Sequence, residues 1–157
     1  MGLFELVPNF SEGRRAEVVD AIVDALTGPE RVWLLDRGMD PDHNRCVITL
    51  AGEGEELVEA AVRGLAEAVK HIDLNRHEGE HKRMGAMDVC PFVPLPGSTT
   101  EEAAALARRA GERIGGELGV PVFLYGAAAA SDERRKLGRI RNKEFEQATR
   151  IVEEMLY

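Results

Sequence analysis

The sequence predicts a mixed α+β domain, and three observations support this prediction. Short apolar runs with the period of a β-strand alternate with longer segments of helical period. Neither an internal repeat nor a linker interrupts this alternation. The chain has 157 residues, of which 44% are hydrophobic, so it can bury a core. We therefore expect one domain over residues 1–157, with the element order βαββαβαβα.

The first half of the chain contains three predicted strands and one helix. Residues 3–7 (LFELV) predict a strand that ends at Pro8. A helix follows, and its core-facing side is expected at Val18, Val19, Ile22, Val23 and Leu26. Residues 32–35 and 46–50 predict the next two strands, while residues 36–45 are rich in Gly, Asp, Pro and Asn. This composition predicts a long hairpin loop that presents polar groups.

The second half begins with an amphipathic helix predicted over residues 55–72. Its core-facing side is expected at Val58, Ala61, Val62, Leu65, Val69 and Ile72. From Asp73 to Asp88 the periodicity is lost, and two glycines among many polar residues predict a loop. The strand predicted at residues 89–95 contains two prolines, so we expect it to lie at an edge or to be distorted.

Three further elements complete the prediction. Ser98 and Glu101 have the spacing of a capping box, which opens a helix that runs to Gly119. Residues 120–125 (VPVFLY) predict the last strand. A final amphipathic helix is expected to reach the C-terminus.

This order suits a ferredoxin-like split βαβ sandwich, in which helices cover one face of an antiparallel sheet, with an extra C-terminal strand and helix. A doubly wound parallel sheet is the competing interpretation. The long loop at residues 36–45 favours the first, because doubly wound folds place a helix between most strands.

Composition excludes several classes of function. With 28 acidic and 20 basic residues the net charge is −8, so we expect no nucleic-acid partner. No apolar run reaches the roughly 18 residues that a membrane span needs, and the first residues lack the pattern of a signal peptide. We therefore expect a cytoplasmic protein without a membrane partner. Cys46 and Cys90 have no metal-ligand spacing and are expected to be buried thiols.

The polar loop contains the pattern HExxH at residues 77–81, which binds zinc when its histidines lie one turn apart on a helix. Such a helix needs an apolar face, and no apolar stripe accompanies the pattern here. Gly79 lies within the pattern and Gly85 lies close to it, and glycine disfavours a helix. We therefore expect no metal. The alternative is proton transfer by His81, because the pKa of an imidazole lies near 6.5.

Six strings of this sequence together resemble a known family. They are residues 7–13 (VPNFSEG), 34–36 (LLD) leading to Asn44 and Arg45, 76–81 (RHEGEH), 83–86 (RMGA), 88–94 (DVCPFVP) and 120–126 (VPVFLYG). In order and spacing they resemble the N-terminal subdomain of glutamate formimidoyltransferase, over essentially the whole chain. The resemblance implies a duplicated ferredoxin-like fold.

For function, the resemblance implies transfer of a formimino group between N-formimidoyl-glutamate and tetrahydrofolate, a step of histidine breakdown. Tetrahydrofolate would be a substrate, and no metal is implied. The catalytic histidine of the family falls on His81. The implied substrate-binding residues are Asp36, Asn44, Arg45, His77, Glu80 and Arg83. We expect the arginines among them to face carboxylates, because a guanidinium matches a carboxylate bidentately.

The transferase unit of the family has two subdomains, and this sequence resembles the first. We therefore expect a homo-oligomer, or a separate chain carrying the second subdomain, to complete the site. Two other functions stay open at this point. One is a non-catalytic folate-binding or regulatory module of the same fold, and the other is metal-dependent hydrolysis through His77 and His81.

Overall fold

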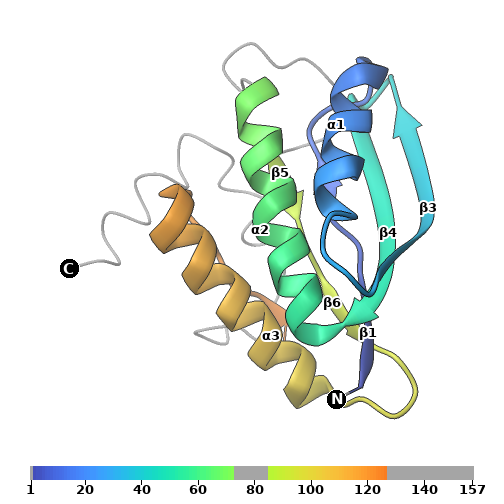
Figure 1. Ribbon diagram of the computed structural model, residues 1–157. Coiled ribbons are helices and arrows are strands. Elements are labelled where there is room, and N and C mark those ends of the chain that lie inside the picture. The colour runs from blue at the N-terminus through green and yellow to red at the C-terminus, as the bar shows by residue number, and fades with distance from the viewer. Residues whose placement is uncertain (1, 73–84, 127–157) are drawn as a thin grey trace.

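Three helices cover one face of an antiparallel sheet in the computed structural model, which describes residues 2–72 and 85–126 (Figure 1). The mixed α+β class is therefore confirmed. The elements are β1 (Leu3–Leu6), β2 (Asn9–Phe10), α1 (Ala16–Leu26), β3 (Val32–Asp40), β4 (Arg45–Glu53), α2 (Gly54–His71), β5 (Met87–Val89), β6 (Phe92–Pro94) and α3 (Thr100–Arg113). A wider helical turn, η1 (Ile114–Leu118), continues α3.

Strand β4 is the centre of the sheet. It pairs with β3 on one side and with β1 and β2 on the other. Beyond these, β6 pairs with β1 and β5 pairs with β2. Pro8 separates β1 from β2, and Pro91 lies between β5 and β6. Both prolines lack a donor, but their carbonyls still accept, from Ile48 N at 3.1 Å and from Val7 N at 3.2 Å. The single strand predicted at residues 89–95 is therefore wrong in extent, because β5 ends at Val89 and β6 begins at Phe92, but the predicted edge position and distortion are confirmed.

The core lies between this sheet and the helices. Alternate residues of β4 are buried, namely Cys46, Ile48 and Leu50, because successive side chains of a strand point to opposite faces. All five residues of the predicted apolar face of α1 are buried, as the sequence predicted. On α2 the predicted face is buried except for Ile72, which is half-buried, and Val69, which is 43% exposed.

The opposite face of the sheet carries no helix in the described part of the chain (Figure 1). The strand register places Val93, Glu5, Ala51 and Trp33 side by side in one row across four strands. Trp33 is 50% exposed, and Val93 is 38% exposed. We call this surface the open sheet face.

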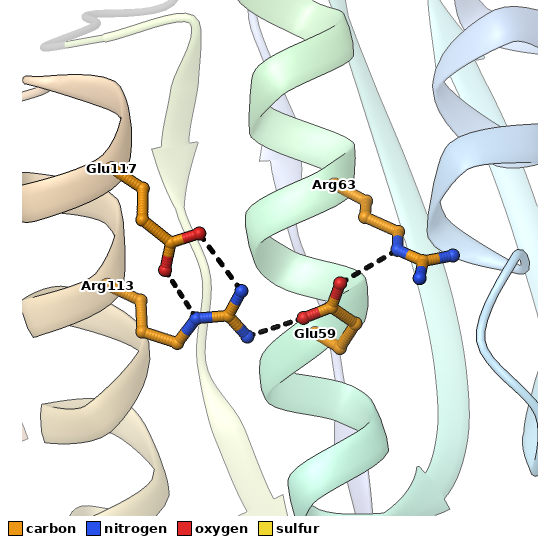
Figure 2. A network of polar contacts seen from close by, with 4 residues as sticks. All are labelled: Glu59, Arg63, Arg113 and Glu117. Atoms are coloured by element: carbon orange, nitrogen blue, oxygen red, sulfur yellow. Dashed lines mark hydrogen bonds and ion pairs between the residues drawn. The ribbon is translucent and has the colours of Figure 1, made fainter.

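A network of charges joins α2 to α3 (Figure 2). The Arg113 guanidinium donates to both carboxylate oxygens of Glu117, at 2.6 and 3.1 Å, and also to Glu59 on α2. Glu59 accepts a further hydrogen bond from Arg63 at 2.9 Å. These hydrogen bonds lower the pKa of Glu59 and of Glu117. The network therefore holds α3 beside α2 in the charged state.

The hairpin between β3 and β4 differs from the prediction. Residues 36–45 were expected to form a loop, whereas β3 continues to Asp40 and β4 starts at Arg45, which leaves a turn of four residues, 41–44. An irregularity in the register between Leu34 and Asp36 lets the strand continue through polar sequence. Cross-strand pairing thus overrides the local composition.

The capping box lies one residue later than predicted. Thr99 is the N-cap of α3, and its side chain and that of Glu102 bond each other's backbone N–H groups, at 3.1 and 2.9 Å. The Ser98 hydroxyl instead donates to Leu3 O at 2.8 Å, which ties the start of the helix to β1. The helical region ends at Gly119, as predicted, with a left-handed φ of 65°.

The prediction of a strand at residues 120–125 is wrong, because this segment forms no strand. Gly111 lacks a side chain, and a Cβ there would lie 3.3 Å from Val122 and 3.4 Å from Leu124. The segment therefore packs against α3 instead of extending the sheet. The predicted final helix lies outside the described residues. Over the described ranges, none of the helices has the length and apolar character needed to cross a bilayer.

Candidate functional site

Three of the predicted site residues belong to the β3–β4 hairpin, namely Asp36, Asn44 and Arg45. The other four, His77, Glu80, His81 and Arg83, lie outside the described residues. The HExxH pattern falls there as well. The described part of the site therefore consists of the hairpin and of the residues that pack against its turn.

Asp36 and Arg45 lie on the open sheet face but not in contact. Asp36 is exposed and pairs in register with Thr49, whereas Arg45 pairs with Asp40. Thr49 and Arg45 are four positions apart on β4, a separation of about 13 Å at the usual rise of a strand. The two side chains can therefore contact different parts of one extended ligand, but not the same group.

Arg45 is half-buried, and its Nε is the buried side-chain nitrogen that has no hydrogen-bond partner among the residues described here. A buried donor without a partner costs about 1–3 kcal/mol. A guanidinium also carries a full positive charge at any physiological pH. An anionic group at this position would satisfy both the charge and the N–H group.

The turn that precedes Arg45 is tied to residues 13 and 14. The Asn44 carboxamide oxygen accepts from Gly13 N at 2.8 Å, and the Asn44 backbone is left-handed with a φ of 50°. Arg14 Nε donates to Pro41 O at 2.8 Å. A Cβ on Gly13 would collide with the backbone of Arg45, so only glycine allows this approach. Asn44 and Gly13 thus fix where β4 begins.

Glu12 organises the segment just before α1. Its side chain is only 5% exposed, and it accepts from the backbone N–H groups of Arg14 and Arg15, each at 3.0 Å. The Arg15 guanidinium donates to it at 2.6 Å. Burial alone raises the pKa of Glu12, but these hydrogen bonds and the Arg15 charge outweigh burial and bring the pKa below its ordinary value. Glu12 is therefore a buried anion at neutral pH.

The same segment contacts the chain on both sides of residues 73–84. Arg15 Nη2 donates to His71 O, the last residue of α2, at 2.7 Å. Ser11 Oγ donates to Gly85 O at 2.9 Å, and Ser11 N donates to Ala86 O at 2.8 Å. Residues 11–15 therefore hold the end of α2 and the residues before β5 at the same time.

The described residues offer neither a metal cluster nor an activated thiol. Within residues 2–72 and 85–126, no three His, Cys, Asp or Glu side chains are grouped as metal ligands. Cys46 is buried, as predicted, and Cys90 is half-buried. Burial raises the pKa of the two thiols, to about 11 and about 12, so both are protonated at neutral pH.

Comparison with known families now identifies the chain. The family model of the formiminotransferase domain, N-terminal subdomain, matches residues 3–156. The chain belongs to this family. The resemblance predicted from the six sequence strings is thereby confirmed.

Relatives of this formiminotransferase subdomain carry matching names. The glutamate formimidoyltransferase of Thermoplasma acidophilum is 49% identical over 93% of this chain and 48% of its own length. That of Streptococcus pyogenes is 44% identical over 92% and 48%. The formimidoyltransferase-cyclodeaminase of Sus scrofa is 47% identical over 92% of this chain and 27% of its own. The subdomain thus spans about half the length of the two glutamate formimidoyltransferases and 27% of the formimidoyltransferase-cyclodeaminase.

Sequence reasoning gave no role to Ser11, Glu12 and Arg15 of this formiminotransferase subdomain. Glu12 and Arg15 have the i, i+3 spacing of a local ion pair, and this signal was available in the sequence. The contacts of Ser11 and Arg15 with Gly85 and His71 span 74 and 56 residues. Such contacts follow from the tertiary structure alone.

Proposed function

We propose that this chain takes part in the transfer of a formimino group between N-formimidoyl-glutamate and tetrahydrofolate. The observation that supports this most is the family match over residues 3–156, together with relatives that are named glutamate formimidoyltransferase. Tetrahydrofolate is a substrate in this proposal, and the reaction needs no metal.

His81 is the proposed general acid and base. An amine nitrogen of tetrahydrofolate adds to the formimidoyl carbon, which forms one C–N bond and a tetrahedral intermediate. His81 accepts the proton of the incoming amine and returns it to the glutamate nitrogen as the old C–N bond breaks. An imidazole suits both steps, because its pKa of about 6.5 lies close to neutral pH.

Arg45 and Arg83 are proposed to bind the carboxylates of the substrates. Among the described residues, the Nε of Arg45 has no hydrogen-bond partner, and this supports the role. A carboxylate can accept hydrogen bonds from Nε and from a terminal nitrogen of the same guanidinium at once. Asp36, His77 and Glu80 are proposed to contact the same ligands. Asn44 is proposed to act through the turn that it fixes against Gly13.

We further propose that the fold is a ferredoxin-like split βαβ unit and that a second subdomain or a second copy of the chain completes the site. The antiparallel pairing of β1 with β4 and β6 supports the fold, since two βαβ units that share one sheet produce this arrangement. The half-length match to the transferases supports the need for a second unit.

The test is a transfer assay with the purified chain, alone and mixed with the remaining half of the Thermoplasma acidophilum relative. We expect transfer in at least one of the two samples, lowered about a hundredfold or more by His81→Ala, in line with the loss of a general acid–base group. The matched control is His71→Gln, whose exposed side chain pairs with Glu67. It should keep the wild-type rate, and an equal loss in both variants would refute the role of His81.

We propose as a second candidate function a non-catalytic folate-binding or regulatory module of the same family. Calorimetric titration of the same samples with tetrahydrofolate distinguishes this function from that of a transferase. Saturable binding without transfer in either sample would replace the first proposal by this one. Neither binding nor transfer would refute both.

A further inference from the structure

Five charged side chains belong to strands β3 and β4, and three of them already have partners. These three form polar pairs of 2.6 to 2.8 Å with residues outside the two strands, namely Arg37 with Asp20, Asp40 with His43 and Glu53 with Arg31. The other two are Asp36 and Arg45. Within the part of the chain that the structure describes, their side chains have neither an ion pair nor a hydrogen bond. They are therefore the two charges of these strands that remain available to a ligand.

Both of these side chains lie on the open sheet face. Cys46 and Ile48 of β4 are buried in the core, so positions 45, 47 and 49 of the same strand point to the other face. Asp36 is opposite Thr49 and therefore shares that face. Thr49 and Arg45 are about 13 Å apart along β4. A single ligand that satisfies both charges must be elongated, with N–H donors at one end and an anionic group at the other.

The surface between the two charges carries no large side chain on β3. Gly38 is opposite Val47 of β4, and this pair lies midway between Asp36 and Arg45 in the register. A Cβ at Gly38 would have no atom within 4 Å among the described residues. The floor of this stretch is therefore one apolar side chain and bare backbone, on which a flat ring can lie without displacing a neighbour.

We propose that tetrahydrofolate lies along β4 on the open sheet face, with its aminopyrimidine ring at Asp36, its glutamate carboxylates at Arg45 and its benzoyl ring over Gly38. The inference rests on the proposed function, in which tetrahydrofolate is a substrate, and it assigns an orientation to that substrate. The aminopyrimidine ring presents two neighbouring N–H donors, which one carboxylate accepts together, and a guanidinium donates to a carboxylate in the same bidentate way. The reverse orientation would set the glutamate carboxylates beside Asp36, where like charges repel.

The covalent structure of tetrahydrofolate suits the separation of the two side chains. A bicyclic ring, a methylene–amine link and a benzoyl group lie between its aminopyrimidine donors and its glutamate carboxylates. N-formimidoyl-glutamate has its cationic and anionic groups only a few bonds apart, so it matches one of the two side chains at a time. The distance between Asp36 and Arg45 therefore selects the longer substrate.

Two altered ligands test the two ends separately. One is the diamide of tetrahydrofolate, in which both glutamate carboxylates are amides, and the other is the 2-desamino analogue, which lacks the exocyclic amino group. Each is titrated calorimetrically, beside tetrahydrofolate, into wild type, Asp36→Asn and Arg45→Met. The sample is the chain alone or the chain mixed with the remaining half of the Thermoplasma acidophilum relative, whichever binds tetrahydrofolate more tightly.

We expect each altered ligand to bind wild type about tenfold more weakly than tetrahydrofolate, as the loss of one charge-assisted contact implies. In Arg45→Met the diamide should bind within about twofold of tetrahydrofolate, whereas the desamino analogue should still lose about tenfold. Asp36→Asn should show the opposite pattern, because changes on the two sides of one contact are not additive. The matched control is Arg37→Met, which removes a guanidinium that is already paired and should keep the pattern of the wild type.

Gly38→Val tests the surface between the two ends. Valine suits a strand and has room at this position, so thermal unfolding should show no loss of stability. Its side chain would occupy the place of the benzoyl ring, so affinity for tetrahydrofolate should fall about tenfold. Wild-type affinity in a stable Gly38→Val would overturn the placement of the ring.

Additive losses in every combination of ligand and variant would overturn the orientation, and so would the reversed assignment of the two altered ligands to the two side chains. Binding and transfer by wild type in either case would leave the proposed function intact. A wild type that neither binds tetrahydrofolate nor transfers the formimino group would refute the proposed function itself, so the two failures are distinguishable.

Discussion

Glu12 and Arg15 form an ion pair of 2.6 Å, and the same carboxylate accepts the backbone N–H of Arg15 at 3.0 Å. Arg15, the N-cap of α1, has no side-chain hydrogen bond that caps the helix, so the buried Glu12 takes over part of that role from outside the helix. One acidic residue thus holds the start of α1 and directs the guanidinium that reaches α2.

Replacing Glu12 by Gln should lower the free energy of unfolding by about 1–3 kcal/mol at pH 7, because charge-assisted hydrogen bonds are lost at a buried site. The folded-state pKa of Glu12 lies below its ordinary value. Its contribution is therefore complete above the ordinary pKa of 4.5 and is lost as the pH falls through the lowered value.

Urea unfolding of the wild type and Glu12→Gln at pH 7 and at acidic pH measures this effect. The difference between the two proteins should shrink on acidification. Glu17→Gln is the control, since Glu17 is an exposed residue in the first turn of α1. Equal stability of Glu12→Gln and wild type at pH 7 would contradict the prediction.

Gly13→Ala should destabilise the protein by more than about 2 kcal/mol, because the new methyl group meets backbone atoms of Arg45 and Asp40 that cannot move independently. Gly38→Ala is the control, since a Cβ at Gly38 on β3 has no atom within 4 Å among those described. Thermal unfolding should place Gly38→Ala within about 0.5 kcal/mol of the wild type. Similar losses in both variants would show that the close approach at Gly13 does not matter.

Arg45→Met should separate binding from stability. Removing a buried N–H without a partner should leave the free energy of unfolding unchanged or raise it by about 1 kcal/mol. If Arg45 binds a substrate carboxylate as proposed, affinity for tetrahydrofolate should fall about tenfold or more, because that charge-assisted contact would be lost. Calorimetric titration and urea unfolding check the two effects. Arg37→Met, which breaks the pair with Asp20, is the control and should keep the affinity.

Glu59→Gln should cost about 0.5–1 kcal/mol at low salt, because Glu59 links Arg63 and Arg113 in one network, and less at high salt through screening. The pKa of Glu59 is lowered, first by its hydrogen bond with Arg113. Its contribution is therefore lost as the pH falls through that lowered value. Glu55→Gln breaks one exposed pair with Arg109 and should cost less in the same denaturation series.

The sequence predicted the elements whose signals are local. The apolar face of α1 followed from spacing alone, because burial of such a face decides whether a helix forms at all. The extent of β3 was missed, since Asp36 and Gly38 disfavour a strand locally and only pairing with β4 keeps them in one. The segment at residues 120–125 has the composition of a strand, yet it packs against α3, where Gly111 has no side chain to keep it away.

The candidate site was predictable in part for the same reason. Asp36, Asn44 and Arg45 were found through the resemblance, and the structure gives Asn44 a backbone partner that no sequence pattern indicates. The roles of Ser11 and Arg15 depend on residues more than fifty positions away. Neither periodicity nor spacing reports on contacts of that range.

The row of side chains on the open sheet face ends in Trp33, which is the single tryptophan of the chain and is 50% exposed. An indole in this position emits at long wavelength while water surrounds it. Anything that settles on this side of the sheet displaces that water and shifts the emission to the blue. The protein therefore carries its own optical reporter, and a fluorimeter can follow the covering of this surface in real time without an attached dye.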